Sequence, residues 1–489
     1  MTATLILTVI VLYFITLVGI SFLTSRGAQN ATFFTGDKNS KWYLVSYGMI
    51  GASLSGVTFI SVPGWVEGEG FSYMQMIIGY MIGYAIIAFV LMPLYYKLNL
   101  TSIYAYLGER YGPIAHKTGA SFFLLSRILG AAVRLFLVAD ILDYFLFNEL
   151  GVSFEITVLI TLLLIYVYTY KGGIKTIVWT DTLQTTFMLA ALSTAIYLIY
   201  SQLGGEVANN GLTSLGITDW FVTDNINEKN HWLKYILSGI FVSVAMTGLD
   251  QDMMQKNLTC KNTKDAQKNM LSFSIILFAV NFVFLILGAL LFTYLHQNIE
   301  LQEAYNLMDE SKRNDRLFPL IALKGEFGNG LGITFLLGLI AAAYSSADSA
   351  LTSLTTSASV DLFQLDKKTD QAKAKKTRQQ IHIGMTAILF ITILLANAFK
   401  EENVIGTLFK IAGYTYGPLL GLFFFGILTK RTVKDSFTLL ISLFVPTLLV
   451  LVMQFESTLF GKYKIGYELL GINGFLCFVL LFVVSKSGK

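Results

Sequence analysis

The sequence predicts an all-α polytopic membrane protein with about thirteen transmembrane helices. Hydrophobic residues make up 54% of the 489 residues and charged residues only 13%, whereas about a quarter of a soluble chain is charged. Apolar runs of about 20 residues recur along the chain, and each is long enough to cross about 30 Å of hydrocarbon. Small and polar residues interrupt two of these runs at membrane depth, a pattern typical of transporters.

The predicted spans follow one another with short connections. The first has no basic leading region and no small-residue cleavage site, so we interpret it as a helix rather than a signal peptide. Hydropathy places the spans at residues 4–24, 42–68, 72–96, 119–146, 153–170, 177–202, 232–256, 270–296, 329–360, 381–398, 403–429, 434–454 and 466–485.

Lysine and arginine are distributed unevenly between the two sets of loops. Because basic loops stay in the cytoplasm, we expect the amino terminus outside and the carboxyl terminus in the cytoplasm of a cell (inner or plasma) membrane. The net charge of +4 reflects this bias and does not indicate nucleic acid. The basic loops are 26–41, 97–117, 171–175, 256–268, 367–378, 430–434 and 486–489, and the opposite side carries 229, 312–324, 400 and 462–464.

The sequence contains no motif that indicates an enzyme. Cys260 and Cys477 are far apart, and the four histidines are scattered, so neither type predicts a metal site. No catalytic triad or phosphate-binding loop is evident. We expect no enzymatic activity, and the expected partners are a small solute, a driving ion and the lipid bilayer, with no oligomer required.

A hydroxyl-rich run with one carboxylate, residues 341–353, lies inside the span at 329–360. A helix advances about 3.6 residues per turn, so Ala342, Ser345, Ser346 and Ser349 share a face and Asp348 lies beside Ser345. Polar groups in lipid are costly unless they face a cavity, an ion or each other. This oxygen-lined face favours a monovalent cation and hence an ion-driven transporter.

Two spans are interrupted at corresponding places, in residues 48–58 and 243–252. Each interruption opens a group of about five spans, and such a matched pair is the best sequence indication of a transporter site. Unwound backbone offers carbonyl oxygens to cations, and half-helix amino ends attract anions. The alternative is that these small residues only allow close helix packing.

A glycine turn at residues 172–173 leads into a helix that carries Asp181 early in its course. Its carboxylate is predicted to meet the hydroxyl face of the 329–360 helix and bind a cation. The alternative is that Asp181 pairs with a lysine or caps the helix start.

Together these segments resemble the sodium/solute symporter family, which includes sugar, sialic acid, proline and monocarboxylate carriers. The resemblance rests on residues 172–184, 249–251 with 255–258, 345–349 and 416–421. It implies a leucine-transporter-type 5+5 inverted repeat. The implied organisation is an additional amino-terminal helix in 1–30, repeats at 42–202 and 232–429, and two additional carboxyl-terminal helices in 434–489.

The resemblance also implies a shared sodium site without a carboxylate. Its ligands here would be the carbonyls of Gly51, Leu54 and Ala342 and the hydroxyls of Ser345 and Ser346. Neutral oxygens compensate only part of an ion's lost hydration, so modest affinity is expected.

Some family members have a second sodium site, and the matching residues here are Asp181, Ser345, Asp348 and Ser349. Asp348 departs from the family pattern, because a serine is expected there. Two carboxylates near one site would bind sodium more tightly or carry a proton. Alternatively, Asp348 points elsewhere and caps a neighbouring helix.

Candidate solute contacts are hydroxyl, amide and charged side chains near the two interruptions. An arginine inside a membrane span is functional by default, and Arg134 could hold a carboxylate with two hydrogen bonds, with pairing to Asp140 or Asp143 as the alternative. The arginine that binds sialic acid in the carriers of the resembled family matches nearer Ala131, one turn away. The predicted solute-binding residues are Ser53, Ser55, Thr58, Gln75, Arg134, Asp250 and Gln251.

The leading hypothesis is symport of a small polar organic solute with one or two sodium ions, by alternating access. The solute would be a sugar, a sialic acid-like sugar acid or a carboxylate. One alternative is a proton-coupled carrier that uses Asp181 and Asp348. The other is a transporter-like sensor, for which we expect a soluble signalling domain that the sequence does not contain.

Overall fold

The structure is a computed structural model that describes residues 3–25, 30–147, 151–368, 370–398 and 404–487. The described residues form helices, and they contain no β-strand beyond two isolated bridges. Parts of two loops used to predict orientation, at 26–29 and around Lys400, lie outside the described residues. Within these limits the all-α prediction is confirmed.

Eight helical segments are long and apolar enough to cross a membrane unaided. Three of them contain a π-helical turn, at Ile87–Leu91, Asp143–Phe147 and Ala358–Leu362. The helices of this group are α1 (Ala3–Thr24), α6 (Tyr73–Ile86) continued by α7 (Met92–Lys97), α9 (Pro113–Leu142), α11 (Ile174–Leu203), α15 (Thr263–Gln297), α18 (Gly328–Ser357), α19 (Gln371–Ala398) and α22 (Asp435–Gln454).

Three further spans are bent pairs of helices. They are α3 (Trp42–Ser53) with α4 (Gly56–Gly64) at 57°, α13 (Trp232–Ser243) with α14 (Gln251–Asn257) at 68°, and α20 (Val404–Thr415) with α21 (Gly417–Leu428) at 45°. Two shorter apolar helices, α10 (Phe154–Gly172) and α24 (Leu469–Val484), complete the set. These elements correspond one for one to the predicted spans, and both predicted interruptions are real breaks.

The break between α3 and α4 opens because the chain leaves the helical hydrogen-bond pattern at Leu54. The Ser55 amide donates to the Ser53 carbonyl at 3.0 Å instead of reaching back to Gly51, and the Phe59 amide starts the next helix by donating to Ser55 at 3.0 Å. The carbonyls of Gly51 and Leu54 therefore lie at the break. This is the backbone arrangement that a cation can use.

The second break passes through one π-helical turn, Val244–Gly248, into Leu249 and Asp250. The Asp250 carboxylate caps α14 by accepting from the amides of Asp252 and Met253 at 2.9 and 3.2 Å. It also accepts a hydrogen bond from Tyr416, near the third bend. Asp250 therefore holds the amino end of α14 by satisfying its free amides.

Small residues set how closely the helices pack. At the crossing of α6 and α13, a Cβ added to Gly239 would lie 2.9 Å from the Gly79 Cα atom, so only glycine fits there. At the contact of α11 and α18, a Cβ added to Gly338 would lie 2.6 Å from that of Ala191. Both pairs bring backbones together where lipid provides little hydrophobic drive for association.

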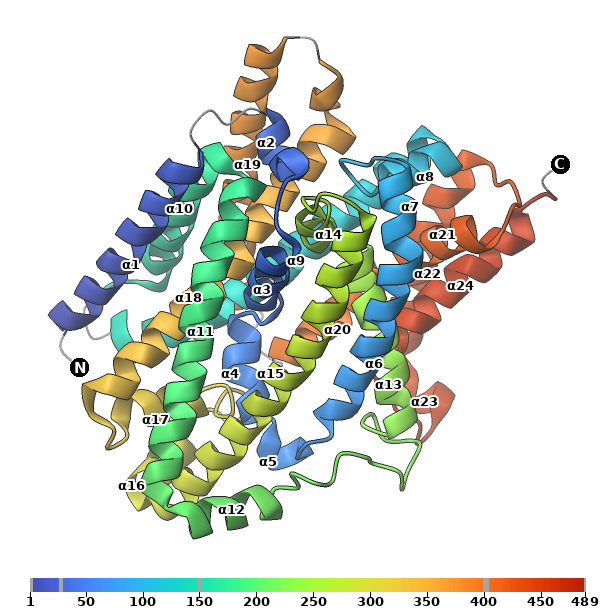
Figure 1. Cartoon of the computed structure of the whole chain (residues 1–489). Helices are drawn as coiled ribbons and strands as arrows, with labels where there is room; N and C mark the ends of the chain where they lie inside the picture. The colour runs from blue at the N-terminus through green and yellow to red at the C-terminus, as the bar shows by residue number, and fades with distance from the viewer. Residues whose placement is uncertain (1–2, 26–29, 148–150, 369, 399–403, 488–489) are drawn as a thin grey trace.

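Figure 1 shows the first broken helix, α3–α4, in the middle of the bundle, with α11 and α18 on one side and α6 and α13 on the other. The short helices α2, α8 and α14 lie at one end of the bundle, and α5, α12 and α16 lie at the other. The short helices are α2 (Asn30–Thr35), α5 (Val66–Glu69), α8 (Ala105–Arg110), α12 (Gly205–Ser214), α16 (Ile299–Asn306), α17 (Leu317–Lys324) and α23 (Glu456–Phe460).

Candidate solute and cation sites

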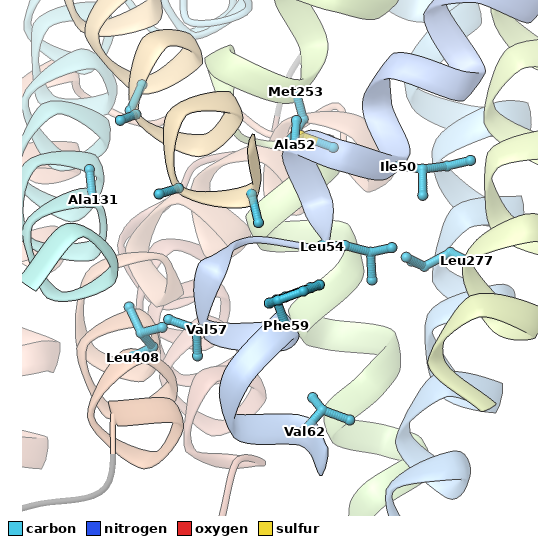
Figure 2. Close-up of a cluster of buried hydrophobic side chains, with 14 of the residues drawn as sticks. Ile50, Ala52, Leu54, Val57, Phe59, Val62, Ala131, Met253, Leu277 and Leu408 are labelled. Atoms are coloured by element: carbon cyan, nitrogen blue, oxygen red, sulfur yellow. The ribbon is translucent and has the colours of Figure 1, made fainter. Parts of the chain in front are cut away.

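A cavity of about 120 Å³ lies at the first break, between α3–α4, α6, α9, α13 and α20. Its apolar wall includes Leu54, Val57 and Leu408, and Figure 2 shows these side chains around the turn of the chain. Its polar lining consists of Ser53, Ser55, Thr58, Tyr73, Tyr80, Tyr84, Arg127, Arg134, Ser243, Thr247 and Asn281. A mixed lining of this kind suits a small organic solute with several polar groups.

Four predicted solute contacts line this cavity: Ser53, Ser55, Thr58 and Arg134. The side-chain Nε atom of Arg134 is buried and has no hydrogen-bond partner among the described residues. The alternative pairing with Asp140 is not found, because Asp140 instead contacts Lys312 at 3.1 Å and Arg316 at 2.8 Å. Arg134 therefore does not pair with Asp140, and the buried carboxylates of Asp250 and Asp252 lie near enough to attract its guanidinium.

Arg127 also lines the cavity, and the sequence analysis missed it. Its guanidinium forms an ion pair with Asp252 of α14, and both side chains are buried. Arg127 lies seven residues before Arg134, two helical turns away on the same side of α9. That spacing is the signal in the sequence that indicates a second cavity arginine.

The other three predicted solute contacts do not line the cavity. Gln75 donates to the Ser72 carbonyl at 2.9 Å and accepts from the Val222 amide at 3.1 Å. Gln251 donates to the Thr101 carbonyl and accepts from the Ile103 amide, both at 3.0 Å. Asp250 caps α14 as described above, so all three side chains are engaged in holding backbone segments in place.

The predicted first sodium ligands belong to two elements that pack against each other, the first break and α18. Helix α18 contacts both α3 and α4, and a Cβ added to Gly56 would lie 3.8 Å from the Ala343 Cα atom. The buried Ser346 hydroxyl has no hydrogen-bond partner in the part of the chain that the structure describes. Ser345 donates its proton to Asp181 at 2.6 Å, which leaves its oxygen lone pairs free for a cation.

Thr185 supports this site from α11. Its hydroxyl accepts from the Gly51 amide at 3.0 Å and donates to the Tyr47 carbonyl at 3.2 Å. A Cβ at Gly51 would collide with the same hydroxyl. Glycine is therefore required at position 51 for α3 to approach α11 so closely.

The predicted second cation set lies between α11 and α18, but Asp181 already has a cationic partner. Lys256 of α14 contacts the Asp181 Oδ2 atom at 2.7 Å, and both side chains are about 1% exposed. The structure therefore shows the alternative in which Asp181 pairs with a lysine. Lys256 was counted above among the cytoplasmic loop charges, and the structure corrects this because its side chain is buried.

Asp348 of the same set faces a different neighbour. Its Oδ2 atom accepts a hydrogen bond from the Tyr168 hydroxyl of α10 at 2.8 Å. Its Oδ1 atom and the Ser349 hydroxyl are buried and have no partner among the described residues. Asp348 contributes no helix cap here, and half of its carboxylate remains available to a ligand.

Paired broken helices, a central polar cavity and oxygen-lined faces define a secondary transporter with a leucine-transporter-type fold. The family model of the sodium:solute symporter family matches residues 33–436. The chain therefore belongs to the sodium:solute symporter family, whose members are sodium-coupled transporters and not enzymes.

Curated relatives cover nearly the whole chain. The sodium/sialic acid symporter NanT of Aliivibrio fischeri is 24% identical over 472 residues, which cover 94% of this chain and 89% of that protein. The sodium/sialic acid symporter SiaT of Proteus mirabilis is 23% identical, with 91% and 88% covered. The human sodium/iodide cotransporter is 25% identical, with 82% of this chain and 62% of that protein covered.

Solved structures support the fold. A sodium-coupled sialic acid symporter in a substrate-bound outward-open state matches with a TM-score of 0.78 and 19% identity, covering 99% of each chain. The nucleobase-cation symporter Mhp1 in a closed conformation matches with a TM-score of 0.55 and 12% identity, covering 92% of this chain and 93% of that one. The predicted leucine-transporter-type fold is thereby confirmed.

Proposed function

We propose that this protein couples sodium to the uptake of a small organic carboxylate, with a sialic acid-like sugar acid as the leading candidate. The observation that carries this choice is Arg134, which lines the cavity and whose buried Nε atom has no hydrogen-bond partner among the described residues. A planar guanidinium matches a carboxylate with two parallel hydrogen bonds. The nearby hydroxyls of Ser53, Ser55 and Thr58 suit a polyhydroxylated solute body.

The second cavity arginine, Arg127, differs from Arg134 in having an acidic partner, and this difference supports Arg134 as the carboxylate-binding residue. Because Asp252 neutralises it, Arg127 adds no net charge to the cavity. Arg134 forms no ion pair among the described residues, so its guanidinium is the cavity group best able to bind a solute carboxylate. A neutral sugar cannot make this contact, so we expect the sugar to bind less well than its acid.

The first sodium would bind at the break, between the carbonyls of Gly51, Leu54 and Ala342 and the hydroxyls of Ser345 and Ser346. Leu54 also lines the solute cavity, so the same turn of chain serves both ligands. Sodium that fixes this turn also fixes the adjoining cavity wall. This shared wall is the physical route by which the two ligands stabilise one conformation.

We also propose that the amino terminus faces outward and the carboxyl terminus lies in the cytoplasm of a cell membrane. The basic loops that adjoin α8 and α14 lie at the same end of the bundle, as the positive-inside rule requires. The inverted repeats would span residues 42–202 and 232–429, so that each begins with a broken helix. The lipid bilayer is the expected partner, and an oligomer is not required.

Counterflow of radiolabelled solutes into proteoliposomes tests the function. The panel contains sialic acid, gluconate, pyruvate and glucose, each measured with sodium and with choline at fixed pH. We expect sodium-dependent exchange of at least one carboxylate and weaker exchange of glucose. Exchange that is the same in choline would refute sodium coupling, and a preference for glucose would refute the carboxylate assignment.

A further inference from the structure

A second cavity, of about 360 Å³, lies between α9, α19, α20 and the segment at residues 311–316 that precedes α17. It shares no lining residue with the solute cavity described above. Its volume lies within the range of small-molecule sites, about 300–1,000 Å³. Sodium-coupled uptake as proposed above does not use this cavity.

The body of the second cavity is apolar. Its lining includes Val133 and Phe136 of α9, Leu395 and Ala396 of α19, and Ile411 of α20. Leu395 is 56% exposed, and α19 is one of the apolar spans. The cavity therefore adjoins the surface that α19 presents to lipid, from which an apolar molecule can enter it.

The charged residues that line the second cavity come from the end of α9 and from the segment before α17. Asp140 binds Lys312 at 3.1 Å and Arg316 at 2.8 Å, and so uses both of its carboxylate oxygens. The Arg316 guanidinium also lies over the Tyr144 ring at 3.8 Å. Its Nε atom, however, is buried and has no hydrogen-bond partner within the described ranges. Buried donors are nearly always paired, so this one indicates a missing acceptor.

The charges around the second cavity are balanced. Two cations, Lys312 and Arg316, and two carboxylates, Asp140 and Asp315, line it. Burial raises the pKa of Asp315 to about 6, so this carboxylate is ionised above that pH. A ligand with a net charge would add an uncompensated charge to a poorly hydrated site, which is costly. The ligand chemistry that fits is therefore a neutral molecule with an acceptor oxygen at one end of an apolar body.

We propose that the second cavity binds a neutral amphipathic molecule, such as an alcohol with an alkyl body, whose oxygen accepts a hydrogen bond from the Arg316 Nε atom. The apolar body of the molecule lies between α9, α19 and α20. This site differs in place and in ligand charge from the solute cavity, which we assign to a carboxylate. The inference goes beyond the proposed function, because binding at this site does not require transport.

The second cavity is linked to the solute cavity through α9 and α20. Val133 lines the second cavity and Arg134 the solute cavity, and Thr407 and Leu408 are divided in the same way. A bound molecule favours the conformation in which its cavity is formed. Since alternating access needs more than one conformation, occupancy of the second cavity should slow uptake without displacing the solute.

The test is photolabelling of the purified full chain in lipid nanodiscs with a diazirine derivative of octanol, at a pH at which Asp315 is ionised. Labelled peptides are mapped by mass spectrometry. Ala396→Phe fills the second cavity from α19. The matched control is Gly384→Phe on the same helix, where an added Cβ would meet no atom within 4 Å. Arg316→Lys keeps a cation for Asp140 but removes the Nε donor.

We expect label on the cavity-lining peptides in the wild type and in Gly384→Phe, and its loss in Ala396→Phe. Equal labelling in Ala396→Phe and in the wild type would overturn the site. Arg316→Lys should raise the octanol concentration for half-maximal competition about tenfold, as expected for one lost hydrogen bond to a charged group. An unchanged concentration would remove Arg316 as the donor.

Octanol, octanoate and octylamine compared as competitors test the charge of the ligand. The amount of each in the nanodisc bilayer is measured, so that partitioning into lipid does not enter the comparison. Octanol should compete at a lower bilayer concentration than either charged analogue. Octanoate or octylamine that competes as well as octanol would overturn the assignment of a neutral ligand.

Uptake into proteoliposomes gives a separate readout. Octanol should lower the maximal rate of sodium-driven uptake in the wild type and in Gly384→Phe but not in Ala396→Phe, with the Kd for solute unchanged. Unchanged uptake at full labelling would overturn the link between the two cavities. A chain that is labelled as expected but shows no sodium-driven uptake supports the second site and refutes the proposed function.

Discussion

Replacing Arg134 with glutamine should weaken binding of a carboxylated solute far more than that of its uncharged analogue. Truncating one partner of a buried, hydrogen-bonded charge pair costs about 2–5 kcal/mol. Arg134 is only partly buried, so we take about 3 kcal/mol, which is roughly a 150-fold rise in Kd. The assay is calorimetric binding of the acid and of its methyl ester, in saturating sodium.

The comparison between the two ligands makes the prediction specific. The ester has no charge to pair with the guanidinium, so we expect its affinity to change by less than about tenfold. Arg134→Lys keeps the charge but loses the two-pronged geometry, and its affinity should lie between those of the wild type and Arg134→Gln. An equal loss for acid and ester would refute the carboxylate role of Arg134.

Three other changes test separate parts of the structure. Ser346→Ala removes one neutral ligand from the first sodium site. The sodium concentration for half-maximal uptake should rise about tenfold, which corresponds to a loss of about 1.4 kcal/mol of sodium-binding free energy. An unchanged concentration would show that Ser346 is not a ligand of that site. Gly51→Ala places a methyl group against the Thr185 hydroxyl and should destabilise the fold by about 1–3 kcal/mol. Adding Thr185→Ala should restore part of the lost melting temperature. If it restores none, the two residues do not clash. Asp315, in the segment between α16 and α17, is buried, and burial raises its pKa to about 6. Folding favours the protonated form of Asp315, so the melting temperature should fall as pH rises from about 4 through 6. Asp315→Asn should abolish this dependence of the melting temperature on pH. A dependence that persists in the variant would show that Asp315 is not its source.

The spans could be predicted because each is defined by local properties. A stretch of apolar residues long enough to cross the membrane must be helical, since lipid offers its backbone no hydrogen-bond partner. The two breaks could also be predicted from the sequence, because glycine, serine and threonine at membrane depth weaken a helix. Ser53, Ser55 and Thr58 followed directly, since they flank the first break and line the cavity.

The pairings across helices could not be predicted in this way. Lys256 lies near a predicted span end and resembles an ordinary cytoplasmic lysine, and only the packing of α14 against α11 places it on Asp181. Gln251 and Asp250 are polar residues at a break, yet both are used to hold backbone groups. Polarity at a break predicts that a residue has a partner, but the fold decides whether the partner is a ligand or the chain itself.

The most direct test of sodium coupling is the affinity for solute as a function of sodium. Solute binding is measured by calorimetry on the purified chain, with sodium replaced stepwise by choline at constant ionic strength and pH. If both ligands stabilise the wall at Leu54, Kd for the carboxylated solute should fall about 5–150-fold from choline to saturating sodium, and solute should tighten sodium binding by the same factor. A Kd that is the same in sodium and in choline would contradict the account.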